Sequence, residues 1–251
     1  MFKKAIFSVS IVTLFPCLAL AQDVEASKDG YNHLSLSYDA TFCSSNLSAL
    51  DDVEGIPGSF TLNGMSLNYL HGFHIPVTNL PMFIETGASL GFNNGSYVDE
   101  GYDLDFNHNR PTVSIDSRNT LSFRNFNLEI PVFYLYRFQT SRRFSIAPYA
   151  GFNFKIHLAI GIKEKWQTMN GNQYTEDEYE WTNAYDKEVW GKCWNRFQVG
   201  AGAGVRIALD NKWTFSAQYL FDLNPVAHLK EDMSDVKAHT ATLRIAAGYK
   251  F

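Results

Sequence analysis

Charged side chains recur on one face of several alternating segments, and they are the first candidates for chemistry in this chain. In these segments apolar residues alternate with small, polar or charged residues, so the charges share the polar face. If the polar face lines the narrow interior of a closed sheet, its charges form either a polar channel or ligand site, or a network of ion pairs that fills the space. The network is favoured because buried charges must be paired. These lumen candidates are Asp39, Glu85, Glu129, Lys155, His157, Arg196, Arg206 and Arg244.

Two groups of Ser, His and Asp residues invite a test for hydrolase or acyltransferase chemistry, because a catalytic serine needs a base and an acid beside it. No Gly-x-Ser-x-Gly elbow accompanies either group. Chance proximity in loops is therefore the better interpretation, and we assign no catalytic residue. The groups are His108 with Ser114 and Asp116, and His239 with Ser234 and Asp235.

The sequence predicts no metal or cofactor site. It contains no Cys-x-x-Cys, no His-Glu-x-x-His and no Cys/His cluster with the spacing of metal ligands. A formal net charge of −5 argues against nucleic-acid binding. A mean hydropathy of −0.19 is too low for a bundle of membrane helices.

The elements that position the charged residues are β-strands, because the alternation has period two. Aromatic residues make up 15% of the chain, which suits strands that meet lipid or pack in sheets. A soluble β-sandwich would also alternate, but its strands would be shorter and its polar face richer in Lys and Glu. The expected strands lie within 34–42, 60–73, 82–93, 125–134, 146–162, 196–209, 213–219 and 242–251.

The connections between these strands alternate in length. Short connections fall at 76–81, 139–143 and 210–212, and long ones at 43–59, 94–119, 163–192 and 224–237. Short periplasmic turns and long outer loops are typical of up-and-down membrane barrels. The sequence therefore predicts an all-β fold, an eight-stranded antiparallel transmembrane β-barrel with short periplasmic turns and long extracellular loops.

The N-terminus has the pattern of an export signal. Lys3 and Lys4 precede an uncharged, mostly apolar stretch, and Ala19-Leu20-Ala21 forms a cleavage site. A membrane anchor is the weaker interpretation because the stretch is short and contains Pro16. We expect a signal peptide at 1–21 and a barrel domain at 22–251, in the outer membrane of a Gram-negative-type bacterium. Export permits a disulfide between Cys43 and Cys193, which the sequence leaves open.

The C-terminus ends on an alternating strand with Tyr249 and Phe251 on its apolar face. A terminal aromatic in this position resembles the signal that the barrel assembly machinery reads during insertion. The same residues also suit the aromatic girdle at the membrane interface. Both roles are compatible.

Several short motifs resemble those of small outer-membrane β-barrel proteins, the PorT-like barrel-domain group. Residues 126–132 read FNLEIPV, like that family's LEIP strand, and 148–151 read PYAG, like its PY-x-G strand. The glycine-alternating segment 197–206 is also similar, and 219–224 resembles the Y-x-x-G-L-x-N element with Asp222 in place of glycine. The resemblance implies the barrel fold over about 31–251 and provides no catalytic residues.

The function expected from these features is a structural or surface-recognition role in the outer membrane. The alternatives are a lipid-modifying barrel enzyme and a small-solute porin. The outer loops are rich in acidic and aromatic residues, which suits a solvated surface or a partner surface. Expected partners are outer-membrane lipid and lipopolysaccharide, the assembly machinery, and an extracellular or envelope protein.

Overall fold

The computed structural model describes residues 30–45, 59–76, 80–105, 112–170, 173–186, 193–231 and 234–251. In this part of the chain no helix is long and apolar enough to span a membrane. The strands are β1 (Tyr31–Ser45), β2 (Phe60–His74), β3 (Met82–Asp105), β4 (Thr112–Tyr136), β5 (Phe138–Gln139), β6 (Phe144–Asn170), β7 (Gln173–Glu178), β8 (Thr182–Asn183), β9 (Phe197–Leu209), β10 (Trp213–Asp222), β11 (Ala227–Glu231) and β12 (Ser234–Lys250).

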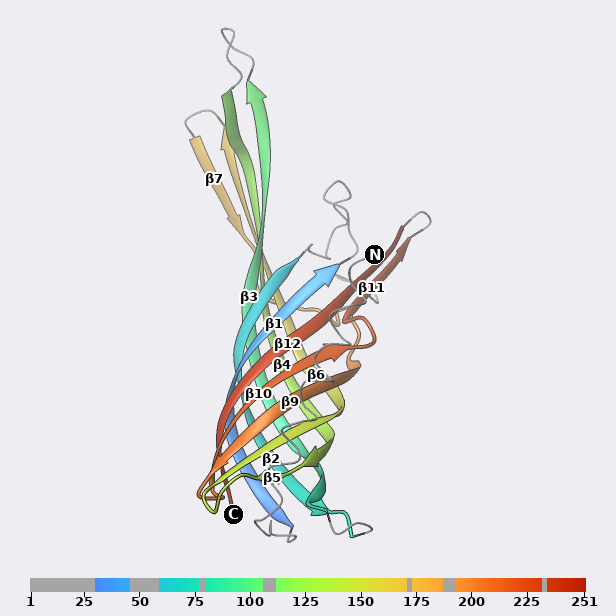
Figure 1. Ribbon diagram of the computed structural model, residues 1–251. Coiled ribbons are helices and arrows are strands. Elements are labelled where there is room, and N and C mark those ends of the chain that lie inside the picture. The colour runs from blue at the N-terminus through green and yellow to red at the C-terminus, as the bar shows by residue number, and fades with distance from the viewer. Residues whose placement is uncertain are drawn as a thin grey trace, which may run out of the picture.

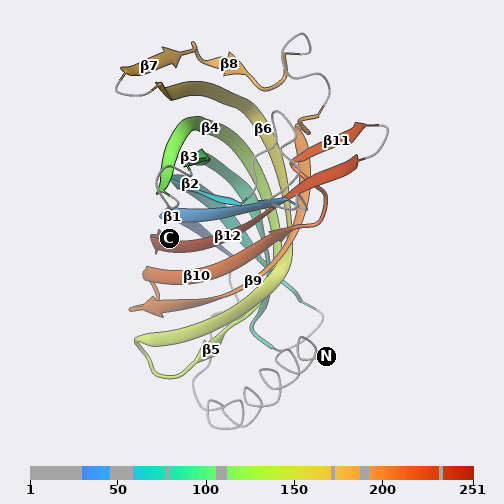
Figure 2. The same cartoon turned by 90° about the horizontal axis from the view of Figure 1, so that it is seen from above.

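Eight of the described strands form a closed antiparallel ring, in the order β1-β2-β3-β4-β6-β9-β10-β12 and back to β1 (Figure 1). The closing pair β12–β1 runs from His33 opposite Lys250 to Ser45 opposite Ala238. β5, β7 and β8 pair with β6, and β11 pairs with β12 (Figure 2). Each ring strand pairs with its neighbours along the chain, so the predicted eight-stranded up-and-down barrel is confirmed. Closure leaves the ring without free strand edges.

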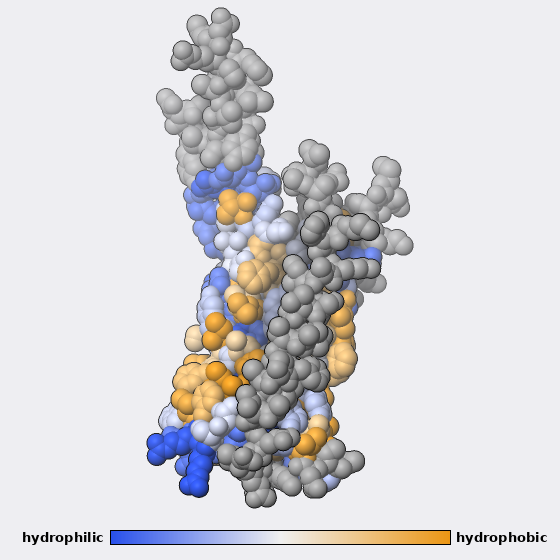
Figure 3. All heavy atoms as spheres, in the orientation of Figure 1, coloured by the Kyte–Doolittle hydropathy of each residue, from blue (hydrophilic) through white to orange (hydrophobic). Residues whose placement is uncertain are grey.

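The outer surface of the ring is apolar and its interior is largely polar. Along β1, for example, Leu34, Leu36 and Tyr38 are 44–54% exposed, whereas His33 and Ser35 are buried. Apolar side chains cover much of the barrel surface in Figure 3. Such a large apolar surface is unstable in water, and a bilayer accommodates it because pairing around the closed ring satisfies the backbone between strands.

Glycines on the inner face of β9 allow bulky side chains to approach the backbone. A Cβ atom at Gly204 would lie 2.6 Å from Cζ of Tyr149, and one at Gly202 would lie 2.5 Å from Cδ2 of Leu220. Large neighbouring side chains therefore lie against bare backbone on this strand. The glycines make room for part of the interior packing.

The long connections differ from the prediction because much of their length is strand. β3 and β4 continue past the ring and pair as far as Asp105 opposite Thr112. β6 continues to Asn170 and pairs with β7, and these hairpins project beyond the other strands (Figure 1). The sequence showed no alternation here because both faces of the projecting sheet are largely polar, so period two leaves no hydrophobic pattern.

A β-bulge in β6 reverses the side-chain alternation in the upper half of that strand. Phe126 pairs with Ala159 and Asn127 with His157, so Leu158 is left without a register partner. Ile160, expected on the lipid face, therefore points inward and is only 5% exposed. A single extra residue changes the face of every residue beyond it.

Candidate functional site in the barrel interior

Seven of the eight lumen candidates are buried, and the structure arranges their charges in three groups. The first group is centred on Arg244 from β12. Its Nε and Nη2 donate to the two oxygens of Asp39 at 2.8 Å, and its Nη1 lies 3.0 Å from Oε2 of Glu129. Ser66 also donates to Asp39, and Asn153 donates to Glu129 at 3.1 Å. One guanidinium thus joins carboxylates from β1 and β4 across the interior.

The second group contains Lys155 from β6 and Asp222 from β10. Their Nζ and Oδ2 atoms are 2.8 Å apart, and the two side chains are only 5% and 1% exposed. Thr240 donates a further hydrogen bond to Asp222. The sequence analysis missed Asp222 as a lumen charge, although its place opposite the apolar Tyr219 and Phe221 in the alternation could have identified it.

The third group lies nearer the short turns and is centred on Glu85. Arg206 and the hydroxyl of Tyr31 both donate to Oε1 of this fully buried carboxylate. The ring of Tyr31 in turn lies 4.9 Å from the guanidinium of Arg137 and 4.8 Å from the ammonium of Lys250. This end of the interior therefore gathers several cations around a single carboxylate and an aromatic ring.

His157 is bound by neutral groups. Its Nδ1 lies 2.9 Å from Oδ1 of Asn125, and its Nε2 lies 2.7 Å from Oε1 of Gln198. The amide nitrogen of Gln198 donates to Thr240 at 3.3 Å, which links the histidine to the Lys155 group. His157 is thus held in the interior by amide side chains from β4 and β9.

Arg196 does not join these groups, which corrects the prediction for that residue. β9 begins at Phe197, so Arg196 lies outside the alternating segment and its side chain is exposed. Its guanidinium stacks on the ring of Tyr185, 4.3 Å from the ring centre. Burial raises the pKa of Tyr185 to about 12, and the nearby Arg196 opposes that shift.

Two apolar clusters lie on either side of the Arg244 and Lys155 groups, which together we call the charged layer, and the Glu85 group lies within the cluster near the short turns. Along β1, Tyr31 belongs to the cluster near the short turns, Asp39 to the charged layer, and Cys43 to the cluster on the loop side. Phe83, Phe133 and Leu135 fill the first cluster. The second consists of Cys43, Leu62, Leu121, Phe123, Ile160, Ile162, Ala184, Val226, Ala227, Val236 and Ala238. The interior of the ring is thus largely filled by side chains, as expected for eight strands.

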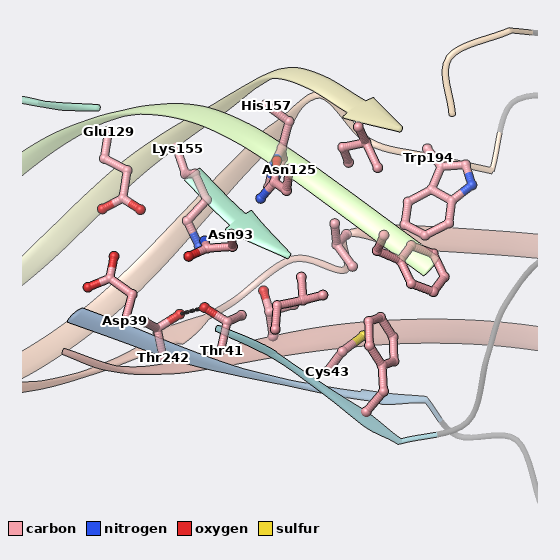
Figure 4. Close-up of a pocket in the computed structure, with 16 residues that line it drawn as sticks. Asp39, Thr41, Cys43, Asn93, Asn125, Glu129, Lys155, His157, Trp194 and Thr242 are labelled. Atoms are coloured by element: carbon pink, nitrogen blue, oxygen red, sulfur yellow. Dashed lines mark hydrogen bonds between the residues drawn. The ribbon is translucent and has the colours of Figure 1, made fainter. Parts of the chain in front are cut away.

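A small cavity remains between the charged layer and the loop-side cluster (Figure 4). Asp39 and Glu129 lie at one end, and Cys43 and Trp194 lie at the other. Its volume is about 30 Å³. That volume holds roughly two water molecules, which is too little for a sugar or an amino acid.

The structure locates some of the candidates for catalysis, metal binding and a disulfide. The residues it describes contain no cluster of three His, Cys, Asp or Glu side chains that could hold a metal ion. The His239 ring stacks on Phe221 with ring centres 6.4 Å apart. Cys43 and Cys193 are buried, and no disulfide joins them. The side chains of His108, Ser114, Asp116, Ser234 and Asp235 lie outside the described part of the structure.

The structure describes only one of the two chain ends for which the sequence predicts a role. Residues 1–21 lie outside the described residues. Phe251 is exposed beside Tyr249, with ring centres 6.5 Å apart, on the outer face at the short-turn end of the barrel. Its backbone N–H and C=O bond to the C=O and N–H of Asn32, which extends the β1–β12 seam to the last residue.

Comparisons with known proteins find similar solved structures but no similar curated sequence. A search of curated protein sequences finds no significant match. Solved structures that resemble the chain include Ail of Yersinia pestis, with 12% identity, a TM-score of 0.38 and coverage of 89% of this chain and 99% of Ail. OprG from Pseudomonas aeruginosa is 12% identical, with a TM-score of 0.36 and coverage of 91% of this chain and 99% of OprG. Neisserial surface protein A is 13% identical, with a TM-score of 0.35 and coverage of 87% of this chain and 97% of that protein.

A family model described as an outer membrane protein beta-barrel domain matches residues 96–228, which is more than half of the chain. The matched residues include β4, β6, β9 and β10 of the ring. The chain is therefore an outer-membrane protein and belongs to the outer membrane protein β-barrel domain family.

Proposed function

We propose that this protein is a closed barrel that presents a β-sheet at the cell surface, where it has a structural or recognition role. The observation that supports the proposal is the continuation of β3, β4 and β6 beyond the ring. Pairing of β2 with β3 ends at Asn63 opposite Asn94, whereas β3 and β4 remain paired to Asp105. At about 3.4 Å per residue, β3 extends roughly 35 Å past its last pair with β2.

The proposal includes how the protein reaches this position. Residues 1–21 act as a removed export signal, and Tyr249 with Phe251 acts as the signal for the barrel assembly machinery. The inserted barrel is surrounded by lipid and lipopolysaccharide, and the projecting sheet meets an extracellular or envelope protein. N-terminal sequencing of the inserted protein should begin at Gln22, and a longer N-terminus would contradict cleavage after Ala21.

A shortened hairpin tests the role of the projecting sheet. Val98 and Thr120 are opposite each other, so residues 99–119 can be replaced by an Asn-Gly turn without changing the register below. The shortened protein should insert normally, which the shift of its gel mobility on heating reports. Cells that carry it should lose attachment to surfaces or host cells if the sheet is a recognition element.

The result separates the two roles and can reject both. If the shortened protein restores the detergent barrier of a deletion strain but not attachment, recognition is supported. If it fails to restore the barrier despite normal insertion, the sheet has a structural role. An epitope placed in 106–111 that antibodies cannot reach on intact cells would overturn the surface proposal. Lipid modification and solute conduction are the alternative functions that activity and conductance assays would reveal.

A further inference from the structure

The projecting sheet of β3, β4, β6 and β7 carries its positive charges on one face only. Residues opposite each other in register share a face, and the face that contains Arg124 is continuous with the lipid-exposed Phe126. We call it the outward face. Its cations are Arg118, Arg124, Lys163 and Lys165. The other face of the sheet carries Asp99, Glu164 and Asp177, with no Lys or Arg among the described partners in register.

Three of the four cations on the outward face have carboxylate partners. Arg118 binds Glu100 at 2.6 Å, Lys165 binds Glu176 at 2.7 Å, and Lys163 binds Glu178. Arg124 differs, because among the described residues no carboxylate lies within ion-pair distance of it. Its guanidinium instead lies 3.7 Å from the centre of the Trp181 ring.

Trp181 is itself held against the outer surface of β6. A Cβ atom at Gly161 would lie 3.3 Å from the ring, so the glycine lets the ring approach the strand closely. The next residue, Thr182, pairs with Ile162 and donates to its carbonyl at 3.1 Å. A guanidinium stacked on a fixed ring is pre-organised and keeps its in-plane N–H donors for an anion.

The stacked pair lies where the lipid-facing surface ends. Arg124 is two residues beyond the lipid-exposed Phe126 along β4, or about 7 Å. Trp residues prefer this interfacial level, where the headgroups lie. Because the long hairpins are on the same side, the level belongs to the outer leaflet.

We propose that Arg124, positioned by Trp181, binds a phosphate group of lipopolysaccharide in the outer leaflet. Arginine suits this ligand because its planar fork gives two parallel hydrogen bonds to phosphate oxygens. The charge pattern of the sheet agrees, since the face continuous with the lipid-exposed surface carries the cations, whereas the other face carries acids and no Lys or Arg among its described partners in register. The inference rests on the proposed placement of the sheet outside the cell.

Binding of purified lipopolysaccharide to the refolded full-length mature protein in detergent tests the inference. Arg124→Ala should weaken binding by about tenfold, because one charge-assisted contact is worth about that factor. Arg142→Ala is the matched control, since Arg142 is an exposed arginine in the short turn between β5 and β6 at the opposite rim. That variant should bind as the unmodified protein does, and heat-dependent gel mobility should show that both are folded.

A second pair of variants tests the role of the aromatic ring. Trp181→Leu should weaken binding by a smaller factor, because Arg124 remains but is no longer held. Trp166→Leu is its control, since Trp166 is 41% exposed on the opposite face of the sheet. Arg124→Lys should retain part of the affinity, since it keeps the charge but loses the two parallel hydrogen bonds.

Binding of different ligands identifies the source of the phosphate. Lipopolysaccharide stripped of its phosphates, and vesicles of phosphatidylglycerol, should both bind more weakly than intact lipopolysaccharide. Equal binding of any of these ligands, or equal binding by Arg124→Ala, would overturn the inference. The proposed function fails separately, when the hairpin epitope is unreachable on intact cells.

Discussion

Lys155 and Asp222 form a buried ion pair whose two members depend on each other for stability. Both side chains are almost fully removed from solvent, and each is the other's only ion-pair partner within 4.0 Å among the described residues. Removing a charge from water is costly, and the partner compensates only while the pair is intact. Removing one member of the pair should therefore lower the free energy of unfolding more than removing both.

We predict that Asp222→Ala lowers the free energy of unfolding by about 3–5 kcal/mol, because it leaves the buried Lys155 ammonium without its ion-pair partner. The double variant Lys155→Met with Asp222→Leu should lose much less. Urea unfolding in detergent micelles measures both. Arg143→Ala is the control, since its pair with Asp210 at 3.5 Å is highly exposed and worth little. Equal losses in the single and double variants would contradict the argument.

Glu178 on β7 offers a test of electrostatics outside the membrane. The hydrogen bond and charge of Lys163 hold the pKa of this exposed carboxyl below its ordinary value. Because the folded pKa is depressed, the pair stabilises β7 above the unfolded pKa and is lost as pH falls through the folded pKa. Lys163→Met should raise the pKa of Glu178 in a carbonyl NMR titration. An unchanged titration midpoint would show that the pair does not form in solution.

Individual lumen residues could be predicted from alternation alone, but their partners could not. The alternation placed Glu129 and Arg244 on the inner face, yet their contact depends on which strands face each other across the ring. The prediction that Arg196 faces the interior was wrong because β9 begins one residue later, at Phe197. Asp222 was noticed only as a departure from a glycine motif, and its role became clear from Lys155.

At the scale of elements, the strands of the ring follow from the hydrophobic pattern, whereas the projecting hairpins do not. Within the membrane one face meets lipid and the other the interior, so period two appears in the sequence. Beyond Leu121 and Ile162 both faces of the sheet are largely polar, and only pairing between strands reveals it. The bulge at Leu158 could not be predicted either, because an extra residue can be recognised only from the register with the partner strand.

The bulge in β6 leads to a prediction about the strand register above it. Deleting Leu158 should turn Ile160 and Ile162 toward lipid and remove both from the loop-side cluster, so the barrel should refold poorly. Leu158→Ala is the matched control, because it shortens an exposed side chain and keeps the register. The fraction of protein with heat-shifted gel mobility measures both. Refolding of the deletion at the level of the control would show that the bulge is dispensable.

The last strand gives a prediction about assembly. Phe251 contributes two backbone hydrogen bonds to Asn32 at the end of a long seam, so its loss removes little of the β1–β12 pairing. Deleting Phe251 should lower the amount inserted in cells, while refolding into detergent should survive. Quantitative blotting of outer-membrane fractions, beside in vitro refolding yields, measures the two effects. Normal insertion of the deletion in cells would reject the assembly-signal role.

At the scale of the whole molecule, the interior is organised in three layers along the barrel axis. Near the short turns Phe83 and Leu135 are almost fully buried, and on the loop side Ile162 is equally buried. The Arg244 and Lys155 groups lie between these apolar layers, the Glu85 group lies within the short-turn layer, and the cavity beside the charged layer holds roughly two water molecules. A solute that crossed the barrel would have to displace all three layers, which are closely packed or ion-paired.

We therefore predict that the unmodified protein passes no sugars or amino acids when reconstituted into liposomes. A general porin reconstituted at the same protein-to-lipid ratio should give rapid swelling and serves as the positive control. Glu129→Ala should lower the free energy of unfolding by about 1–3 kcal/mol without opening a path, because Arg244 keeps Asp39 but loses its second carboxylate. Swelling at porin-like rates by the unmodified protein would refute the closed barrel, and swelling by Glu129→Ala alone would show that the charged layer is the barrier to solutes.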